Sequence, residues 1–445
     1  MSDATASVPE APLKERVAKA RGKFLSMASA YALGAFNDNF FKQAGMLMMV
    51  QAGMTDKQAL AIIFFMLPFL IFASYAGWLA DRYAKRNVII GAKVLEVTAM
   101  LAGAAGIFYG SLPLIYIMLF IIGTQACIFS PALNGSIPEL YPAEYVTQAN
   151  AKVKLAVNVM ILAGIILAGV CLVNKNSVEH PGETVAQVEG AFGEPTMGRL
   201  YIAITVVGVA LCGLGLSLGV PKFPSANPTA PFPWAGPVET LKTLYGLRRD
   251  KLLFVSIFGC SFIWFLAVVQ VTLINSIGGI RQFALPEDQI SMLLVPQMVG
   301  LGIGGVVSGF LAKGPRWHRV LAPACFGLAL CMGAVHFVIE APEGLRVSIF
   351  MTLVGCVGFF GGLIMVPVES FIQIRPAPED KGKVIAAANF AAYLGMCIAG
   401  GVFKALDLLP APLDAFALSG AFALVAGVAL MLLLPKAAAA DSNRV

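Results

Sequence analysis

The chain has 445 residues, of which 58% are hydrophobic and only 13% are charged. A soluble domain carries about 25% charged residues, so this composition excludes an ordinary water-soluble fold. The net charge of +6 does not indicate nucleic acid as a partner, because Lys and Arg recur in short clusters between apolar runs. Three scattered histidines and eight cysteines within apolar runs form no metal-ligand pattern, so we expect no metal and no cofactor.

Twelve apolar segments follow one another along the chain, each long enough to be a spanning helix of about 20 residues. We therefore predict an all-α membrane protein with twelve transmembrane helices in two pseudo-symmetric six-helix bundles. The predicted spans are 25–50, 59–80, 88–109, 113–133, 152–173, 198–220, 252–275, 289–312, 320–339, 346–368, 383–404 and 412–434.

Lys and Arg residues concentrate in alternate connections, and this bias sets the orientation of a membrane protein. It places both termini in the cytoplasm. The predicted organisation has five parts. They are a cytoplasmic N-terminal segment (1–24), a first six-helix bundle (25–220), a Pro-rich cytoplasmic linker (221–250), a second six-helix bundle (251–434) and a cytoplasmic tail (435–445).

The two halves resemble each other weakly. Residues 77–81 at the end of span 2 read GWLAD, and residues 309–313 at the end of span 8 read GFLAK. A basic cluster follows each stretch. Repeats at matching places in a six-plus-six chain predict a substrate site between the two bundles, near mid-membrane.

The sharpest motif lies between spans 2 and 3 and runs from Gly77 to Arg86, with the sequence GWLADRYAKR. Here the chain resembles the major facilitator superfamily, and Ala84 is the clear departure because glycine is usual there. The resemblance implies that Asp81 and Arg82 latch against the start of helix 11, where a helix N-terminus favours a carboxylate. An ordinary basic loop would explain Lys85 and Arg86 but not Asp81. The predicted gating residues are Gly77, Asp81, Arg82 and Arg86.

Span 1 contains a polar run in which Asp38 and Lys42 lie one helical turn apart. A charge near the bilayer centre costs about 3 kcal/mol or more, so both side chains must face protein or water. Their spacing allows them to pair on one helix face. The pair is either a structural ion pair or part of a substrate site.

Further polar residues occur inside other spans, and Glu369 is the most costly of them to bury. Lys93 in span 3 either snorkels toward the interface or reaches the cavity. The predicted substrate-binding residues are Asn37, Asp38, Phe40, Phe41, Lys42, Glu96, Gln125, Glu369, Gln373 and Asn389.

Three segments indicate a particular family within this superfamily. They are residues 34–39 (GAFNDN), residues 129–135 (FSPALNG) and residues 366–369 (VPVE), which lead to Asn389. Together they look like the lysophospholipid transporter family. That resemblance implies inward flipping of lysophospholipids, such as lysophosphatidylethanolamine, across the bacterial inner membrane by alternating access. It also implies an acyltransferase/acyl-carrier-protein synthetase as a partner that reacylates the flipped lipid.

Such a substrate needs a polar headgroup pocket and an apolar lane. Asp38 could face an ammonium group and Lys42 a phosphate, with Phe40, Phe41 and residues 262–265 as apolar wall. Related members carry an arginine in span 7 that this chain lacks, which leaves its headgroup preference open.

Two other functions compete with this interpretation. A carrier of a small soluble solute or drug fits the same superfamily, and an apolar opening reachable sideways from the lipid would argue against it. A membrane-embedded acyltransferase would need a His followed by an Asp four to six residues on. His180, His318 and His336 have no such Asp. We expect no enzyme, no catalytic residue and a monomeric transporter.

Overall fold

The computed structural model describes residues 13–141, 143–172, 195–222, 224–225, 227–279, 282–312, 314–376 and 381–442. Of the predicted cytoplasmic ends, residues 1–12 and 443–445 lie outside this description. The described residues form helices, joined mostly by short turns and once by the longer linker before α7, and contain no strand. The helices are α1 (Leu13–Gln51), α2 (Lys57–Arg82), α3 (Lys85–Tyr109), α4 (Leu112–Leu140), α5 (Ala143–Leu172), α6 (Met197–Ser217), α7 (Gly236–Gly246), η1 (Leu247–Arg249), α8 (Lys251–Gly278), α9 (Glu287–Met292), α10 (Val295–Leu311), η2 (Gly314–Val320), α11 (Leu321–Ala334), η3 (Val335–Glu340), α12 (Glu343–Ile374), α13 (Lys381–Leu406) and α14 (Pro412–Ser442).

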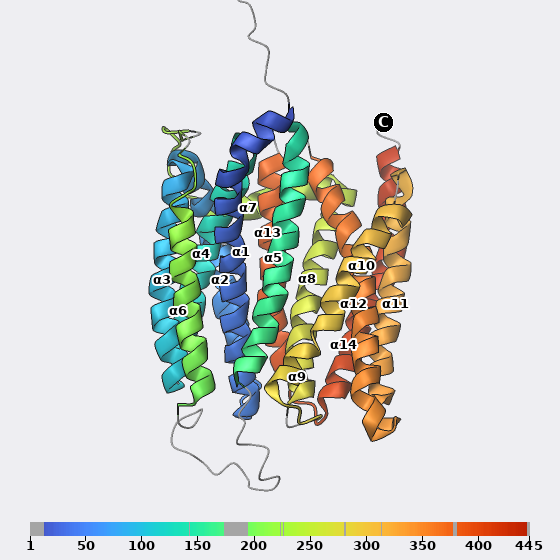
Figure 1. Cartoon of the computed structure of the whole chain (residues 1–445). Coiled ribbons are helices and arrows are strands. Elements are labelled where there is room, and N and C mark those ends of the chain that lie inside the picture. The colour runs from blue at the N-terminus through green and yellow to red at the C-terminus, as the bar shows by residue number, and fades with distance from the viewer. Residues whose placement is uncertain are drawn as a thin grey trace, which may run out of the picture.

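The long helices stand side by side in two groups, α1–α6 and α8–α14 (Figure 1). Helix α1 begins and α14 ends at the same end of the molecule. We call this the inner end, because the basic residues Arg82, Lys85 and Lys251 lie there at helix termini. The opposite end is called the outer end.

Eleven segments of the described residues are long and apolar enough to cross a membrane, with α9 and α10 forming one of them. Helix α1 is not among the eleven, since the polar run between Asn37 and Gln43 lowers its hydropathy. It nevertheless packs along α5 and α6 as a full-length helix of its bundle. The predicted arrangement of twelve spanning helices in two halves is therefore confirmed, with α1 as the twelfth.

Small residues bring helices into backbone contact within each half. In the second half, a Cβ at Gly304 of α10 would lie 1.9 Å from the Phe359 carbonyl oxygen of α12, and a Cβ at Gly362 would lie 2.2 Å from that of Leu301. In the first half, a Cβ at Gly123 of α4 would lie 2.2 Å from the carbonyl oxygen of Phe65 in α2. Membrane helices associate through such close contacts, since water supplies no hydrophobic drive between them.

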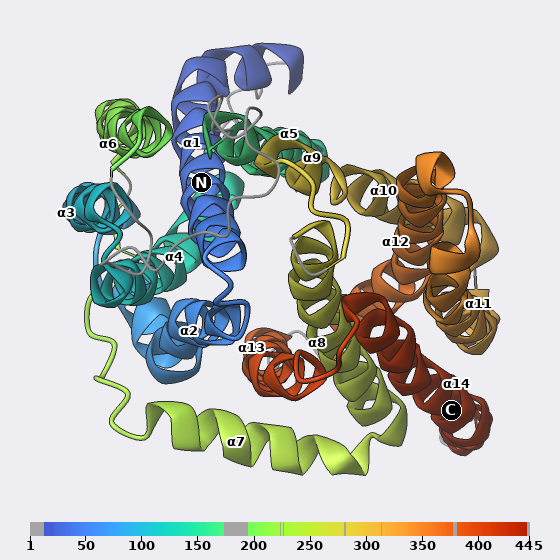
Figure 2. The same ribbon diagram turned by 90° about the horizontal axis from the view of Figure 1, so that it is seen from below.

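The linker between the halves contains a feature that the sequence did not predict, the helix α7. It lies across the outside of α2, α13 and α8 instead of running along them (Figure 2). The preceding segment packs on the inner end of α2, where Phe232 stacks on Tyr75 with ring centres 5.4 Å apart. The Pro-rich segment is therefore attached to the first bundle.

Candidate functional site

The polar run of α1 divides between two faces of the helix. Asn37 is fully buried and donates a hydrogen bond of 3.0 Å to the carbonyl oxygen of Val206 in α6. Phe40 and Phe41 are also fully buried and pack among the hydrophobic residues of the first bundle. Asp38 and Lys42, one turn apart, point the other way, into a cavity between the two bundles. The helical period thus separates the packing face from the cavity face.

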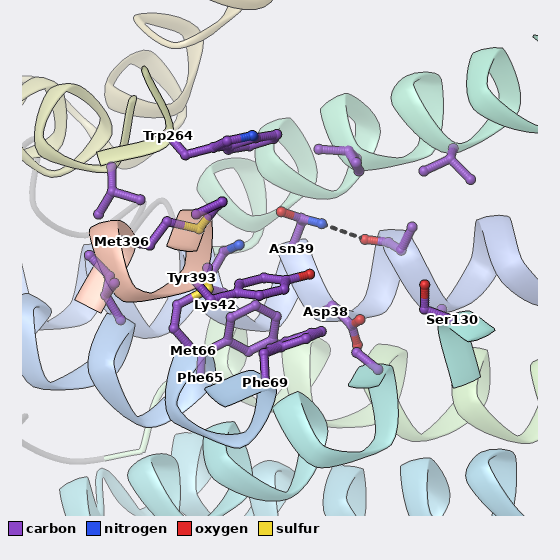
Figure 3. A pocket seen from close by; sticks show the side chains of 18 of the residues that line it. Asp38, Asn39, Lys42, Phe65, Met66, Phe69, Ser130, Trp264, Tyr393 and Met396 are labelled. Atoms are coloured by element: carbon purple, nitrogen blue, oxygen red, sulfur yellow. Dashed lines mark hydrogen bonds between the residues drawn. The ribbon is translucent and has the colours of Figure 1, made fainter. Parts of the chain in front are cut away.

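The cavity has a volume of about 540 Å³, within the range of small-molecule sites. Trp264 of the second bundle faces Phe65, Phe69 and Tyr393 across it (Figure 3). Helices α1, α2, α3, α4, α5, α8, α12 and α13 all contribute to its wall. The polar and charged residues that line it are Tyr31, Asp38, Asn39, Lys42, Lys93, Gln125, Ser130, Glu369, Asn389 and Tyr393.

A buried ion pair lies at the charged part of this wall. Lys93 Nζ is 2.6 Å from Glu96 Oε2, and both side chains are only 1% exposed. Gln125 Nε2 donates a second hydrogen bond of 3.3 Å to the same oxygen. Glycine at position 34 makes room for the pair, because a Cβ there would lie 2.7 Å from Lys93 Nζ. Of the two interpretations of Lys93, snorkelling is wrong and the cavity position is correct.

Asp38 and Lys42 do not form the ion pair that their spacing allows; no contact within 4.0 Å joins their charged atoms in this described part of the chain. Asp38 Oδ1 is buried and has no hydrogen-bond partner. The Lys42 ammonium lies 4.9 Å from the centre of the Phe65 ring, at cation–π distance. Both charged groups therefore face the cavity and form no ion pair with each other.

Some of the remaining predicted binding residues line the cavity and others do not. Gln125, Glu369 and Asn389 line the cavity, and Glu96 lies directly behind the wall as the partner of Lys93. Gln373 is exposed near the end of α12 and is not part of the lining. The apolar lane assigned to Phe40 and Phe41 is supplied by other residues, since these two rings lie in the packed core.

The apolar side of the cavity comes mainly from residues that the sequence did not single out. Tyr393 of α13 stacks on Phe69 of α2 with ring centres 4.2 Å apart, which joins the two bundles. Met66 and Met396 lie beside them (Figure 3). Trp264 lies in the predicted apolar stretch 262–265. Nothing in the local sequence distinguishes Phe69 or Tyr393 from other aromatic residues in spanning helices.

The motif between α2 and α3 lies at the inner end. Arg82 Nη1 donates a hydrogen bond of 2.8 Å to the Ala230 carbonyl oxygen, and Trp78 Nε1 donates one of 3.1 Å to the same atom. Arg86 Nη2 donates one of 2.9 Å to the Leu218 carbonyl oxygen at the end of α6. These arginines therefore hold the linker and α6. The Asp81 carboxylate is exposed, and the side chains that begin α13 lie outside the description, so the latch stays a prediction.

At the outer end, four buried polar side chains join the bundles. Gln43 Nε2 of α1 donates to Asn275 Oδ1 of α8 over 3.1 Å, and Gln58 Nε2 of α2 donates to Ser276 Oγ over 3.3 Å. All four are at most 2% exposed. We call this set of four residues the outer seam. It joins α1 and α2 of the first bundle to α8 of the second bundle.

The sequence-family model that describes the Major Facilitator Superfamily matches residues 23–400 of this chain. The chain belongs to this superfamily. Two curated relatives are lysophospholipid transporters named LplT. The one from Citrobacter koseri is 24% identical over 90% of this chain and 93% of its own length. The one from Pectobacterium carotovorum subsp. carotovorum is 25% identical over 84% of each chain.

Solved structures of the superfamily share the fold. A D-xylose–proton symporter superposes with a TM-score of 0.66 at 14% identity, covering 93% of this transporter and 98% of the symporter. At that identity the likeness concerns the arrangement of helices alone. Together with the superfamily membership, it makes this protein a multi-pass membrane transporter.

Proposed function

We propose that this transporter moves lysophospholipids such as lysophosphatidylethanolamine from the outer to the inner leaflet of the bacterial inner membrane by alternating access. One observation carries the proposal: a single cavity between the bundles joins a charged wall to an apolar wall. The charged wall contains Asp38, Lys42 and Lys93, and the apolar wall contains Phe69 and Trp264. A single-chain lipid with a charged headgroup needs both.

The headgroup is assigned to α1. Asp38 and Lys42 lie on one face, about 6 Å apart at their Cβ atoms in an α-helix, and their charged atoms form no ion pair with each other. A phosphoethanolamine group carries its ammonium and phosphate at a comparable separation. In this proposal the ammonium faces Asp38 Oδ1, which has no hydrogen-bond partner. The phosphate faces the Lys42 ammonium.

The acyl chain is assigned to the wall opposite. Phe65, Phe69, Trp264 and Met396 border the space next to Lys42, so a chain attached to the phosphate would meet apolar side chains at once. A small hydrophilic solute would leave this surface wet, and burying apolar surface is worth about 25 cal/mol per Å². The wall therefore favours a lipid over a sugar-like solute.

The likeness to proteins named lysophospholipid transporters supports the same substrate. We extend the proposal to a partner on the cytoplasmic side, an acyltransferase/acyl-carrier-protein synthetase that reacylates the flipped lipid. The proposal assigns the basic inner end, where α1 begins and α14 ends, to the cytoplasm, and with it both termini. The working unit is proposed to be the monomer, because one chain contains both bundles and the whole cavity.

The test is uptake of radiolabelled lysophosphatidylethanolamine into proteoliposomes, with lipid left in the outer leaflet extracted by albumin. Wild-type protein should protect the label from extraction, and Asp38→Asn and Lys42→Ala should reduce the protected fraction about tenfold or more, as expected for loss of a charged contact. Gln373→Ala, outside the cavity, is the matched control and should transport normally. Xylose and a nucleoside serve as soluble substrates.

If the wild type protects no lysolipid but takes up a soluble substrate, the lipid proposal is wrong and the protein is a solute carrier. If Asp38→Asn keeps full transport, the headgroup assignment is wrong even though the lipid remains the substrate.

A further inference from the structure

We propose that the linker helix α7 is a membrane-surface element that binds anionic phospholipid headgroups of the inner-end leaflet. The proposal does not depend on the transported substrate. It is carried by the depth at which α7 lies, by the three different faces of the helix and by the basic residues at its C-terminal end.

The depth of α7 follows from its contact with α2. A Cβ at Gly236, the first residue of α7, would lie 3.3 Å from both Ser74 and Tyr75. Tyr75 is seven residues from the inner end of α2 at Arg82, a distance of about 10 Å along a helix axis. Helix α2 has 26 residues, or about 39 Å, against a hydrocarbon core of about 30 Å. With the excess of α2 divided between its two ends, the start of α7 lies about 6 Å inside the inner boundary of the hydrocarbon, a depth to which interfacial helices bury their apolar face.

The helix lies across the bundle and not along it, as Figure 2 shows. With about 100° of rotation per residue, its side chains fall on three faces. Gly236, Thr240 one turn on and Leu244 two turns on form the face packed on α2 and α13. The other two faces are exposed and differ in polarity.

One exposed face is apolar and consists of Val238, Leu241 and Tyr245, spaced three and four residues apart; Tyr245 is 67% exposed. The other carries Glu239 and Lys242. The apolar face lies between the packed face and the polar face. When the polar face is in contact with water, the apolar face is turned toward the membrane. An amphipathic helix at an interface has this arrangement.

Aromatic and basic residues extend the same surface. Trp234, two residues before α7, is 87% exposed, and tryptophan is enriched at the membrane–water boundary. The Arg248 guanidinium lies 4.4 Å from the centre of the Tyr245 ring, beside the apolar face. Lys242, Arg249 and Lys251 are also exposed.

The basic residues determine which lipid this surface prefers. Between residues 236 and 251 four basic side chains stand against two acidic ones, and one of the latter, Asp250, is paired with Arg375 at 2.9 Å. Basic residues next to a membrane attract anionic lipids of the adjacent leaflet. Charge complementarity therefore favours phosphatidylglycerol-like headgroups over zwitterionic ones.

The experiment measures where Trp234 lies in full-length protein reconstituted into vesicles. Trp78, Trp264 and Trp317 are replaced by Phe, so that the emission comes from Trp234 alone. If that variant does not fold, the emission of Trp234→Phe is subtracted from that of the wild type. We expect strong quenching by lipid brominated near the headgroup and weak quenching by aqueous acrylamide. Quenching by brominated phosphatidylglycerol should exceed that by brominated phosphatidylethanolamine.

The charge arm uses Lys242→Gln combined with Lys251→Gln. Losing these two exposed basic residues should remove most of the excess quenching by brominated phosphatidylglycerol. Lys222→Gln, which removes an exposed charge after α6, is the matched control and should leave the excess unchanged. Full quenching by acrylamide without any by bromolipid would overturn the proposal. Shielding from both quenchers would assign the surface to a protein partner, and equal quenching in the two lipids would refute the anionic preference.

Discussion

The buried pair Lys93–Glu96 should stabilise the first bundle, so that removal of one partner is more damaging than removal of both. The charged atoms lie 2.6 Å apart, which corresponds to an attraction of about 6 kcal/mol at an effective dielectric constant of about 20. Desolvation of both groups offsets much of this attraction. Breaking such a pair by removing one partner costs about 3–5 kcal/mol, because the remaining charge stays buried.

The two single variants should differ. Lys93→Met leaves two carboxylates, Glu96 and Asp38, in the same electrostatic environment, with Lys42 as the remaining cation that acts on Asp38. Glu96→Gln leaves the Lys93 ammonium with the Asp38 carboxylate. We therefore expect Lys93→Met to be the more destabilising of the two.

The assay is thermal unfolding of purified protein in detergent. Each single variant should lower the midpoint on the order of 10 °C, taking about 2–4 °C per kcal/mol for a unit of this size. The double variant, Lys93→Met with Glu96→Gln, should recover most of the loss, since no uncompensated charge remains. A double variant whose midpoint falls by the sum of the single losses would show that the two residues act independently and that the reasoning is wrong.

Gly304→Leu should abolish the folded, monodisperse protein on size-exclusion chromatography, whereas Gly302→Leu should not, because a Cβ at Gly302 meets nothing within 4 Å; equal yields would contradict the α10–α12 packing. Gln43→Ala removes one hydrogen bond of the outer seam, about 1 kcal/mol, so amide exchange around Asn275 should accelerate about fivefold, and an unchanged rate would contradict the seam. Trp264→Ala should raise KM for a long-chain lysolipid more than for a short-chain one; equal increases would exclude an acyl-chain contact.

The number of helices and their division into halves could be predicted because the bilayer imposes a length and an apolar composition on every span. The linker helix α7 could not, since it is short and its Pro-rich surroundings indicate a spacer. Its helical form depends on packing against α2 and α13, which hydropathy does not report.

The site was predictable in part for the same reason. Asp38, Lys42, Glu369 and Asn389 stand out because polar residues inside a span are costly, and all four line the cavity. The apolar wall was not predictable, because a Phe or Tyr that faces a cavity has the same composition as one that faces lipid. Phe40 lies on the packed face and not in the predicted apolar lane, since it is two residues from both Asp38 and Lys42 and therefore about 200° around the helix from each.

The chemistry of the outer seam has a consequence for energetics across the membrane. Gln43, Gln58, Asn275 and Ser276 carry no formal charge, so parting them moves no charge through the transmembrane field. Each elementary charge that crosses the field would contribute about 2.3 kcal/mol per 100 mV. Separation of these four side chains therefore adds no voltage dependence of its own to the opening of the outer end.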